Sequence, residues 1–73
     1  MATLKVQSEV AGTVWEIVSH PGQVLEVEAT IMIVESMKME IPVVAPARAT
    51  LKVLLVQKGD VVSEGQDLAI LET

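Results

Sequence analysis

The chain of 73 residues contains no cysteine, no phenylalanine and no tyrosine, and Trp15 is its one aromatic residue. Without cysteine no disulfide bond can form, which fits a reducing compartment, and we expect a cytoplasmic protein. Hydrophobic residues make up 51% of the chain, so the core must be built from Val, Ile, Leu, Ala and Met. We expect one domain over residues 1–73, because the chain is too short for two cores, with Trp15 as a half-buried packing residue.

Basic residues are also scarce, with five Lys and Arg against ten Asp and Glu and a formal net charge of −5. Binding to nucleic acid requires clustered Lys and Arg, and five scattered basic residues form no such stripe. Long apolar runs are missing too. The stretch from Thr50 to Gln57, interrupted by Lys52, is far shorter than the roughly 20 residues of a membrane span. We therefore expect neither nucleic acid nor a membrane as a partner.

The sequence offers no cluster of catalytic or metal-binding residues. The single histidine, His20, precedes Pro21 in a turn and has no other ligand type beside it. No nucleophile stands next to a base in the sequence, so we expect a protein that is not itself an enzyme. No phosphate-binding pattern surrounds Gly22, Gly59 or Gly65, which we interpret as structural turn residues.

Short runs rich in Val and Ile alternate with turn signals along the whole chain. In the first half the predicted strands are Thr13–Val18, Gln23–Val27 and Thr30–Glu35, and the turn 19–22 (Ser-His-Pro-Gly) separates the first two. Breakers recur too often for helices. The pattern indicates an all-β sandwich or flattened barrel of about eight strands.

The sequence aligns with itself at an offset of 37 positions, which places residues 8–36 on residues 45–73. The identical pairs are Thr13 and Thr50, Gly22 and Gly59, Val24 and Val61, Ile33 and Ile70, and Glu35 and Glu72. Because two turn glycines and their apolar neighbours coincide, we interpret the halves as pseudo-repeats related by a twofold rotation. The junction 37–44 should then project from one end of the molecule, with the two termini at the other.

The most informative segment is that junction, which begins within Glu35-Ser36-Met37-Lys38-Met39-Glu40. The runs 31–34 and 41–44 on either side are strand-like in composition. They predict a β-hairpin with Met37 and Lys38 at its tip. Both methionines should lie near the surface there, and the lysine amine should stand clear of the body of the domain.

The segment Met37-Lys38-Met39 resembles the modification site of biotin carboxyl carrier domains, which belong to the biotinyl/lipoyl domain family. The resemblance covers nearly the whole chain and is carried by further motifs: Ala11-Gly12-Thr13-Val14, Pro21-Gly22-Gln23-Val24, Ala45-Pro46, Lys58-Gly59-Asp60-Val61-Val62 and Glu64-Gly65-Gln66-Asp67-Leu68. It is especially similar to the short free-standing biotin/lipoyl attachment proteins. It implies a flattened barrel of two four-stranded antiparallel sheets with an internal quasi-twofold, a barrel-sandwich hybrid.

The resemblance also implies a function. Lys38 would carry covalent biotin, added by a biotin protein ligase, and the domain would shuttle carboxyl-biotin between a biotin carboxylase and a carboxyltransferase. Met37 and Met39 would be recognition residues for these partners. Glu35, three positions before the lysine, would help to keep lipoylating enzymes away, although Glu35 and Glu40 could equally be solvated charges. Ser36 is a further candidate residue beside the tip. Lipoyl domains usually carry Asp-Lys-Ala at the tip, so biotin is favoured, with lipoyl as a possible alternative cofactor.

The sequence departs from the family pattern at several positions. Ser36 stands where most carboxylase carriers have alanine, although the short attachment proteins share the serine. Glu28 and Ala49 stand where turn glycines are usual. If either residue needs a positive φ, it costs roughly 1 kcal/mol. The chain also lacks an Ala/Pro-rich N-terminal arm and a protruding insertion, which argues against the main carrier subunit of acetyl-CoA carboxylase. We expect a free-standing protein, because the chain begins with Met1 and fits one domain tightly.

Two classes of function stay open at this point. The first is a biotin carrier module, or a lipoyl carrier of the same kind. The second is a small β-barrel interaction module in which Lys38 is an ordinary solvated lysine and is never modified. The sequence does not name the acceptor of the carboxyl group.

Overall fold

Eight β-strands make up the computed structural model, which describes residues 2–73. The strands are β1 (Thr3–Gln7), β2 (Gly12–Ile17), β3 (Val24–Leu25), β4 (Thr30–Ser36), β5 (Met39–Val44), β6 (Ala49–Leu54), β7 (Val61–Val62) and β8 (Asp67–Glu72). Residues 2–73 contain no helix, hence none that is long and apolar enough to cross a membrane. The expected all-β class is confirmed.

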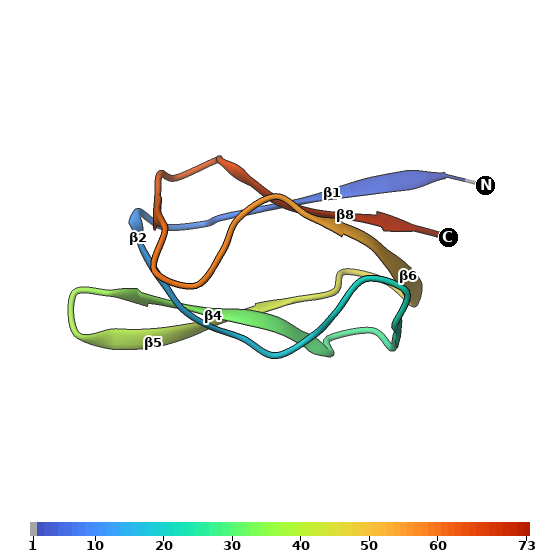
Figure 1. Cartoon of the computed structure of the whole chain (residues 1–73), viewed down its shortest axis with the longest axis horizontal. Helices are drawn as coiled ribbons and strands as arrows, with labels where there is room; N and C mark the ends of the chain where they lie inside the picture. The colour runs from blue at the N-terminus through green and yellow to red at the C-terminus, as the bar shows by residue number, and fades with distance from the viewer. Residues whose placement is uncertain (1) are drawn as a thin grey trace.

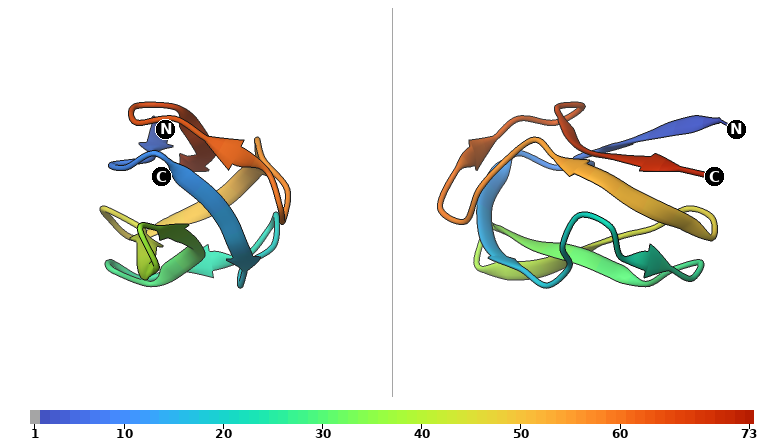
Figure 2. Two further views of the ribbon diagram at one scale, coloured as in Figure 1. Left: turned by 90° about the vertical axis from the view of Figure 1, so that its left-hand side faces the viewer. Right: turned by 45° about the vertical axis from the view of Figure 1, so that its right-hand side comes forward.

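The strands form two four-stranded sheets, with the orders β1-β8-β6-β3 and β5-β4-β2-β7. All strand pairs within them are antiparallel. Figure 2 shows the two sheets as layers, with β1, β8 and β6 above and β4 and β5 below. The predicted pair of four-stranded antiparallel sheets is therefore confirmed.

The core lies between the two sheets and is almost entirely aliphatic. Its buried residues are Val6, Val14, Leu25, Ile31, Met32, Val34, Ala45, Ala49, Leu51, Val56, Val62, Leu68, Ala69 and Leu71. The burial of apolar surface is the main force that holds such sheets together. Trp15 lies outside this core and is 43% exposed, at a register shift between Val14 and Glu16 of β2.

The strand bounds repeat at the offset of 37 residues found in the sequence. Shifting β2, β3 and β4 by this offset gives the starting residues of β6, β7 and β8. The pairing register repeats as well, because Val14 pairs with Val34 while Leu51 pairs with Leu71. A register shift follows Val14 in one half and Leu51 in the other. A superposition of the halves by a rotation near 180° remains a prediction.

The repeat extends further toward the N-terminus than residues 8–36. The edge strand β1 pairs with β8, and β5 pairs with β4 in the same register 37 residues away. For example, Leu4 faces Leu71, and Ile41 faces Val34. A shift of 37 residues therefore relates each strand of one sheet to a strand of the other sheet. Sequence identity gives little sign of this relation, because Val6 and Val43 are the one identical pair at matching positions of β1 and β5.

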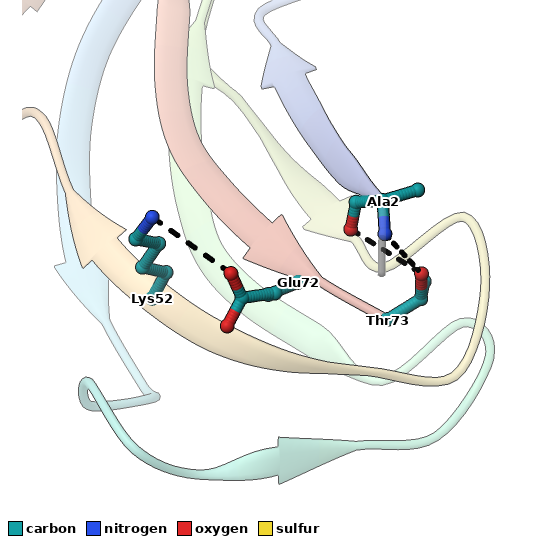
Figure 3. A network of polar contacts seen from close by, with 4 residues as sticks. All are labelled: Ala2, Lys52, Glu72 and Thr73. Carbon is teal, nitrogen blue, oxygen red and sulfur yellow. Dashed lines mark hydrogen bonds and ion pairs between the residues drawn. The ribbon is translucent and has the colours of Figure 1, made fainter.

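The β4–β5 turn and the chain termini lie at opposite ends of the molecule (Figure 1), whose extents are 36 × 18 × 17 Å. At the terminal end, the amide of Thr73 donates a hydrogen bond to the carbonyl of Ala2 at 2.9 Å. The nearby side chains Lys52 and Glu72 form an ion pair at 3.8 Å (Figure 3). The arrangement matches the one that the pseudo-twofold predicts.

The two positions where a turn glycine is usual, Glu28 and Ala49, differ in backbone conformation. Glu28 has a φ of 67°, so it occupies the left-handed region that favours glycine. Its repeat partner Gly65 has a φ of 83°. Ala49 does not carry the strain that a positive φ would cause. This residue begins β6 and is only 5% exposed. A strand conformation accepts a Cβ without strain.

Candidate functional site

The candidate site is the two-residue turn that joins β4 to β5. Ser36 and Met39 are the last paired residues of the two strands, so Met37 and Lys38 alone form the loop. Their φ angles are 54° and 65°, and positive φ at both central residues is what a type I′ turn requires. Such turns prefer Asn-Gly, so two bulky residues here cost roughly 1 kcal/mol each. The conformation of the turn therefore does not explain why Met and Lys occupy positions 37 and 38.

All three residues of the Met-Lys-Met segment are exposed. Met37 is 91% exposed and Met39 is 63% exposed, and Lys38 also lies on the surface. The ion pairs of residues 2–73 use Lys5, Arg48 and Lys52, and none involves Lys38. The lysine amine therefore projects from one end of the molecule between two exposed thioethers.

The strand end beside the lysine turn is hydrogen-bonded to the segment that precedes β2. The hydroxyl of Ser36 donates a hydrogen bond to the carbonyl of Ala11 at 2.7 Å. Beside it, Gly12 lies so close to β4 that an added Cβ would be 2.3 Å from the carbonyl oxygen of Glu35 and 3.0 Å from a methyl group of Val34. Only a glycine fits there.

Two carboxylates face each other at the same level of the hairpin. Glu35 and Glu40 are directly paired across β4 and β5, and both are exposed. Like charges in this position destabilise a hairpin slightly. The repeat provides a comparison, since Glu72 corresponds to Glu35 and is paired with Lys52. Neither Glu35 nor Glu40 takes part in an ion pair of residues 2–73.

The other candidate residues lie apart from this turn. His20 belongs to the β2–β3 connection, where its ring Nδ1 is 3.2 Å from the carbonyl oxygen of Pro21. Residues 2–73 contain no group of three or more His, Cys, Asp or Glu residues placed to hold a metal ion. A cleft of about 300 Å³ between β1 and β5 includes Ile41 and Pro42 but neither Met37 nor Lys38 in its lining.

Sequence reasoning found the turn but not its support. The motif Ala11-Gly12 was noted as part of a family pattern, without a role. In the structure these two residues contact the strand that ends at the candidate lysine. A glycine at the start of a β-branched run was the available signal, because it often marks a close approach of another backbone.

The sequence profile of the family described as "Biotin-requiring enzyme" matches residues 5–71. The chain belongs to the biotin/lipoyl attachment domain family. This match covers the turn, its supports and six of the strands completely, from β2 to β7. The resemblance that the motifs indicated is therefore confirmed.

Several characterised proteins are similar to this family member. A biotin/lipoyl attachment protein of Bacillus subtilis is 37% identical over 65 residues, which are 89% of each chain. A "Biotinylated protein TB7.3 homolog" of Mycobacterium leprae is 33% identical over 90% of this chain and 93% of its own length. A probable dihydrolipoyllysine-residue succinyltransferase component from Schizosaccharomyces pombe is 34% identical, over 92% of this chain but only 15% of that protein.

Two large carboxylases contain a domain of the same fold. The urea carboxylase of Kluyveromyces lactis matches with a TM-score of 0.92 and 28% identity over 97% of this chain and 6% of the carboxylase. A single-chain, multi-domain long-chain acyl-CoA carboxylase matches with a TM-score of 0.90 and 28% identity, over 96% and 7%. In both cases the attachment domain corresponds to a small part of a much longer chain.

Proposed function

We propose that this attachment domain is a biotin carrier, modified on Lys38, that serves a biotin-dependent carboxylase system in the cytoplasm. One observation carries the proposal: the lysine occupies the tip of a two-residue turn, exposed, without an ion pair and between two exposed methionines. Its partners would be a biotin protein ligase, a biotin carboxylase and a carboxyltransferase. The similarity to two carboxylases supports these partners.

The attachment reaction needs little from the carrier beyond presentation of the amine. The Lys38 amine attacks the carbonyl carbon of an activated acyl adenylate, an amide bond forms, and AMP leaves. Lysine amines are mostly protonated at neutral pH, and no ion pair of residues 2–73 involves Lys38, so the ligase must supply the base. The exposed tip allows the ligase to surround the amine on every side except that of the hairpin itself.

The shape of the domain suits a carrier that visits separate active sites. Attached biotin accepts a carboxyl group at one site and delivers it at another. Lys38 lies at one end of the 36 Å axis and the termini lie at the other. The body of the domain therefore stays outside an active site while the tip enters it. Tethering raises the effective concentration of the attached group at both sites.

The choice between biotin and lipoyl rests on the residues beside the lysine. Met37 and Met39 favour biotin, while relatives with names that refer to lipoyl support lipoylation as the second candidate. The double change Met37→Asp with Met39→Ala should impair biotinylation and favour lipoylation. Both ligation systems should compete for wild-type and variant protein, with the products weighed by mass spectrometry. Equal rates of lipoylation and biotinylation of the wild type would contradict the assignment.

The site itself is tested by the change Lys38→Arg, which keeps the charge but removes a competent nucleophile. We expect no biotin on this variant after co-expression with a ligase, by avidin blotting and intact mass. Lys58→Arg is the matched control, because Lys58 also lies exposed in a turn but lacks flanking methionines, and it should be modified like wild type. Biotin on the Lys38→Arg protein would refute the assignment, and an unmodified wild type would favour the interaction module.

A further inference from the structure

The methionines of residues 2–73 fall into two groups of opposite exposure. Met32 is completely buried in the core at 0% exposed, whereas Met37 and Met39 are 91% and 63% exposed. Thioethers on the surface react with peroxides, while a buried thioether is protected. We propose that Met37 and Met39 form a site of reversible oxidation by hydroperoxides that blocks recognition of the tip. The regulatory part rests on the proposed modification of Lys38.

The reaction at each sulfur is a two-electron oxygen transfer. A sulfur lone pair attacks one oxygen of hydrogen peroxide, the S–O bond forms and the O–O bond breaks. The thioether becomes a sulfoxide, and the second peroxide oxygen leaves as water after a proton transfer between the two oxygens. Since Met37 is the more exposed of the pair, it should react first. A methionine sulfoxide reductase restores the thioether with two electrons from a thiol reductant, which becomes a disulfide while the oxygen leaves as water.

Oxidation at these positions would change recognition without unfolding the domain. Neither side chain belongs to the aliphatic core, so the added oxygen remains in water in the free protein. A partner that covers the tip must instead bury it. Burying an unsatisfied polar oxygen is unfavourable, whereas a thioether packs well against apolar surfaces. The two residues flank the lysine directly, so any enzyme that reaches the amine has to contact them.

The chain offers an internal map of where oxygen is added. Cleavage after glutamate separates the methionines, because it releases residues 29–35 with Met32 and residues 36–40 with Met37 and Met39, apart from Met1 in residues 1–9. After hydrogen peroxide treatment of the folded apoprotein, we expect one and then two added oxygens on the 36–40 peptide. The 29–35 peptide should stay unchanged.

The functional arm measures biotinylation of the same samples by a biotin ligase. We expect oxidised wild type to lose roughly tenfold or more of its rate at an unchanged melting temperature, and methionine sulfoxide reductase to restore it. The variant Met37→Leu with Met39→Leu keeps apolar side chains that peroxide does not attack. Its rate, whatever its starting value, should not change after peroxide.

Three results would overturn the proposal. The first is oxidation of the 29–35 peptide as fast as the 36–40 peptide. The second is an oxidised wild type that is biotinylated at its original rate, and the third is a lost rate that the reductase does not restore. Failure of the proposed function gives a different result. Wild-type protein without peroxide treatment would then receive no biotin, while peroxide-treated protein would still be oxidised on the 36–40 peptide and not on the 29–35 peptide.

Discussion

The contact between Gly12 and β4 gives the sharpest prediction for the fold and the site together. In Gly12→Ala the new Cβ would lie 2.3 Å from the carbonyl oxygen of Glu35, so the two backbones must separate by about 1 Å to reach ordinary contact. Overpacking of this kind costs typically 1–3 kcal/mol and sometimes more. The nearest neighbour, the carbonyl of Glu35, is strand backbone, which cannot rotate away as a flexible side chain could.

We expect Gly12→Ala to lower the free energy of unfolding by about 2–3 kcal/mol, after a small gain from reduced chain entropy. For a domain of this size, that corresponds to a fall of roughly 10–20 °C in the melting temperature. Denaturant titration and thermal melting would measure both quantities. Because the displaced backbone belongs to Glu35, the lysine turn should shift too, and biotinylation of the folded variant should slow several-fold.

The repeat supplies the matched control. Ala49 occupies the position equivalent to Gly12 and is 5% exposed. The reverse change Ala49→Gly should destabilise by about 1 kcal/mol, through a lost buried methyl group and added chain entropy. It lies in the other sheet from the hairpin and should leave the modification rate unchanged. A Gly12→Ala protein within about 0.5 kcal/mol of wild type would refute the argument from close approach.

Two further changes test local strain and charge. Glu28→Asn should raise the free energy of unfolding by about 0.5 kcal/mol, since asparagine tolerates the left-handed conformation at φ 67° better than glutamate does; a decrease in denaturant titration would contradict this. Glu40→Lys should stabilise the hairpin by about 0.3 kcal/mol at low salt, because it replaces a like-charge pair with Glu35 by an opposite one. That gain should shrink as ionic strength rises, and a gain independent of salt would show that charge is not its cause.

Much of the architecture could be predicted because local signals and the repeat agree. Turn glycines recur at matching positions, and β-branched runs separate them, so strand number and class follow from short-range chemistry. The lysine turn was also predictable, since two strand-like runs flank a segment that is too short for a longer loop. These features depend on residues that are neighbours in sequence.

The remaining features depend on contacts between residues distant in sequence. The hydrogen bond from Ser36 to Ala11 spans 25 positions, and the close approach of Gly12 to Glu35 is visible only once β2 and β4 are paired. Strand β1 was outside the predicted repeat because it matches β5 in register but shares only one identical pair with it, Val6 and Val43. Propensity and periodicity carry no information about such cross-strand geometry.

The hydrogen-bonded termini have an architectural consequence. Ala2 and Thr73 lie directly beyond the ends of β1 and β8, at the positions that correspond to Met39 and Ser36 of β5 and β4. The two ends of the chain are therefore arranged like a hairpin whose turn has been cut. The whole domain could therefore be inserted into a single surface loop of a host protein, because its two termini lie side by side. The lysine would then face away from the host in every such fusion. Closing the termini with a two-residue turn and opening the chain in another loop should yield a circularly permuted carrier.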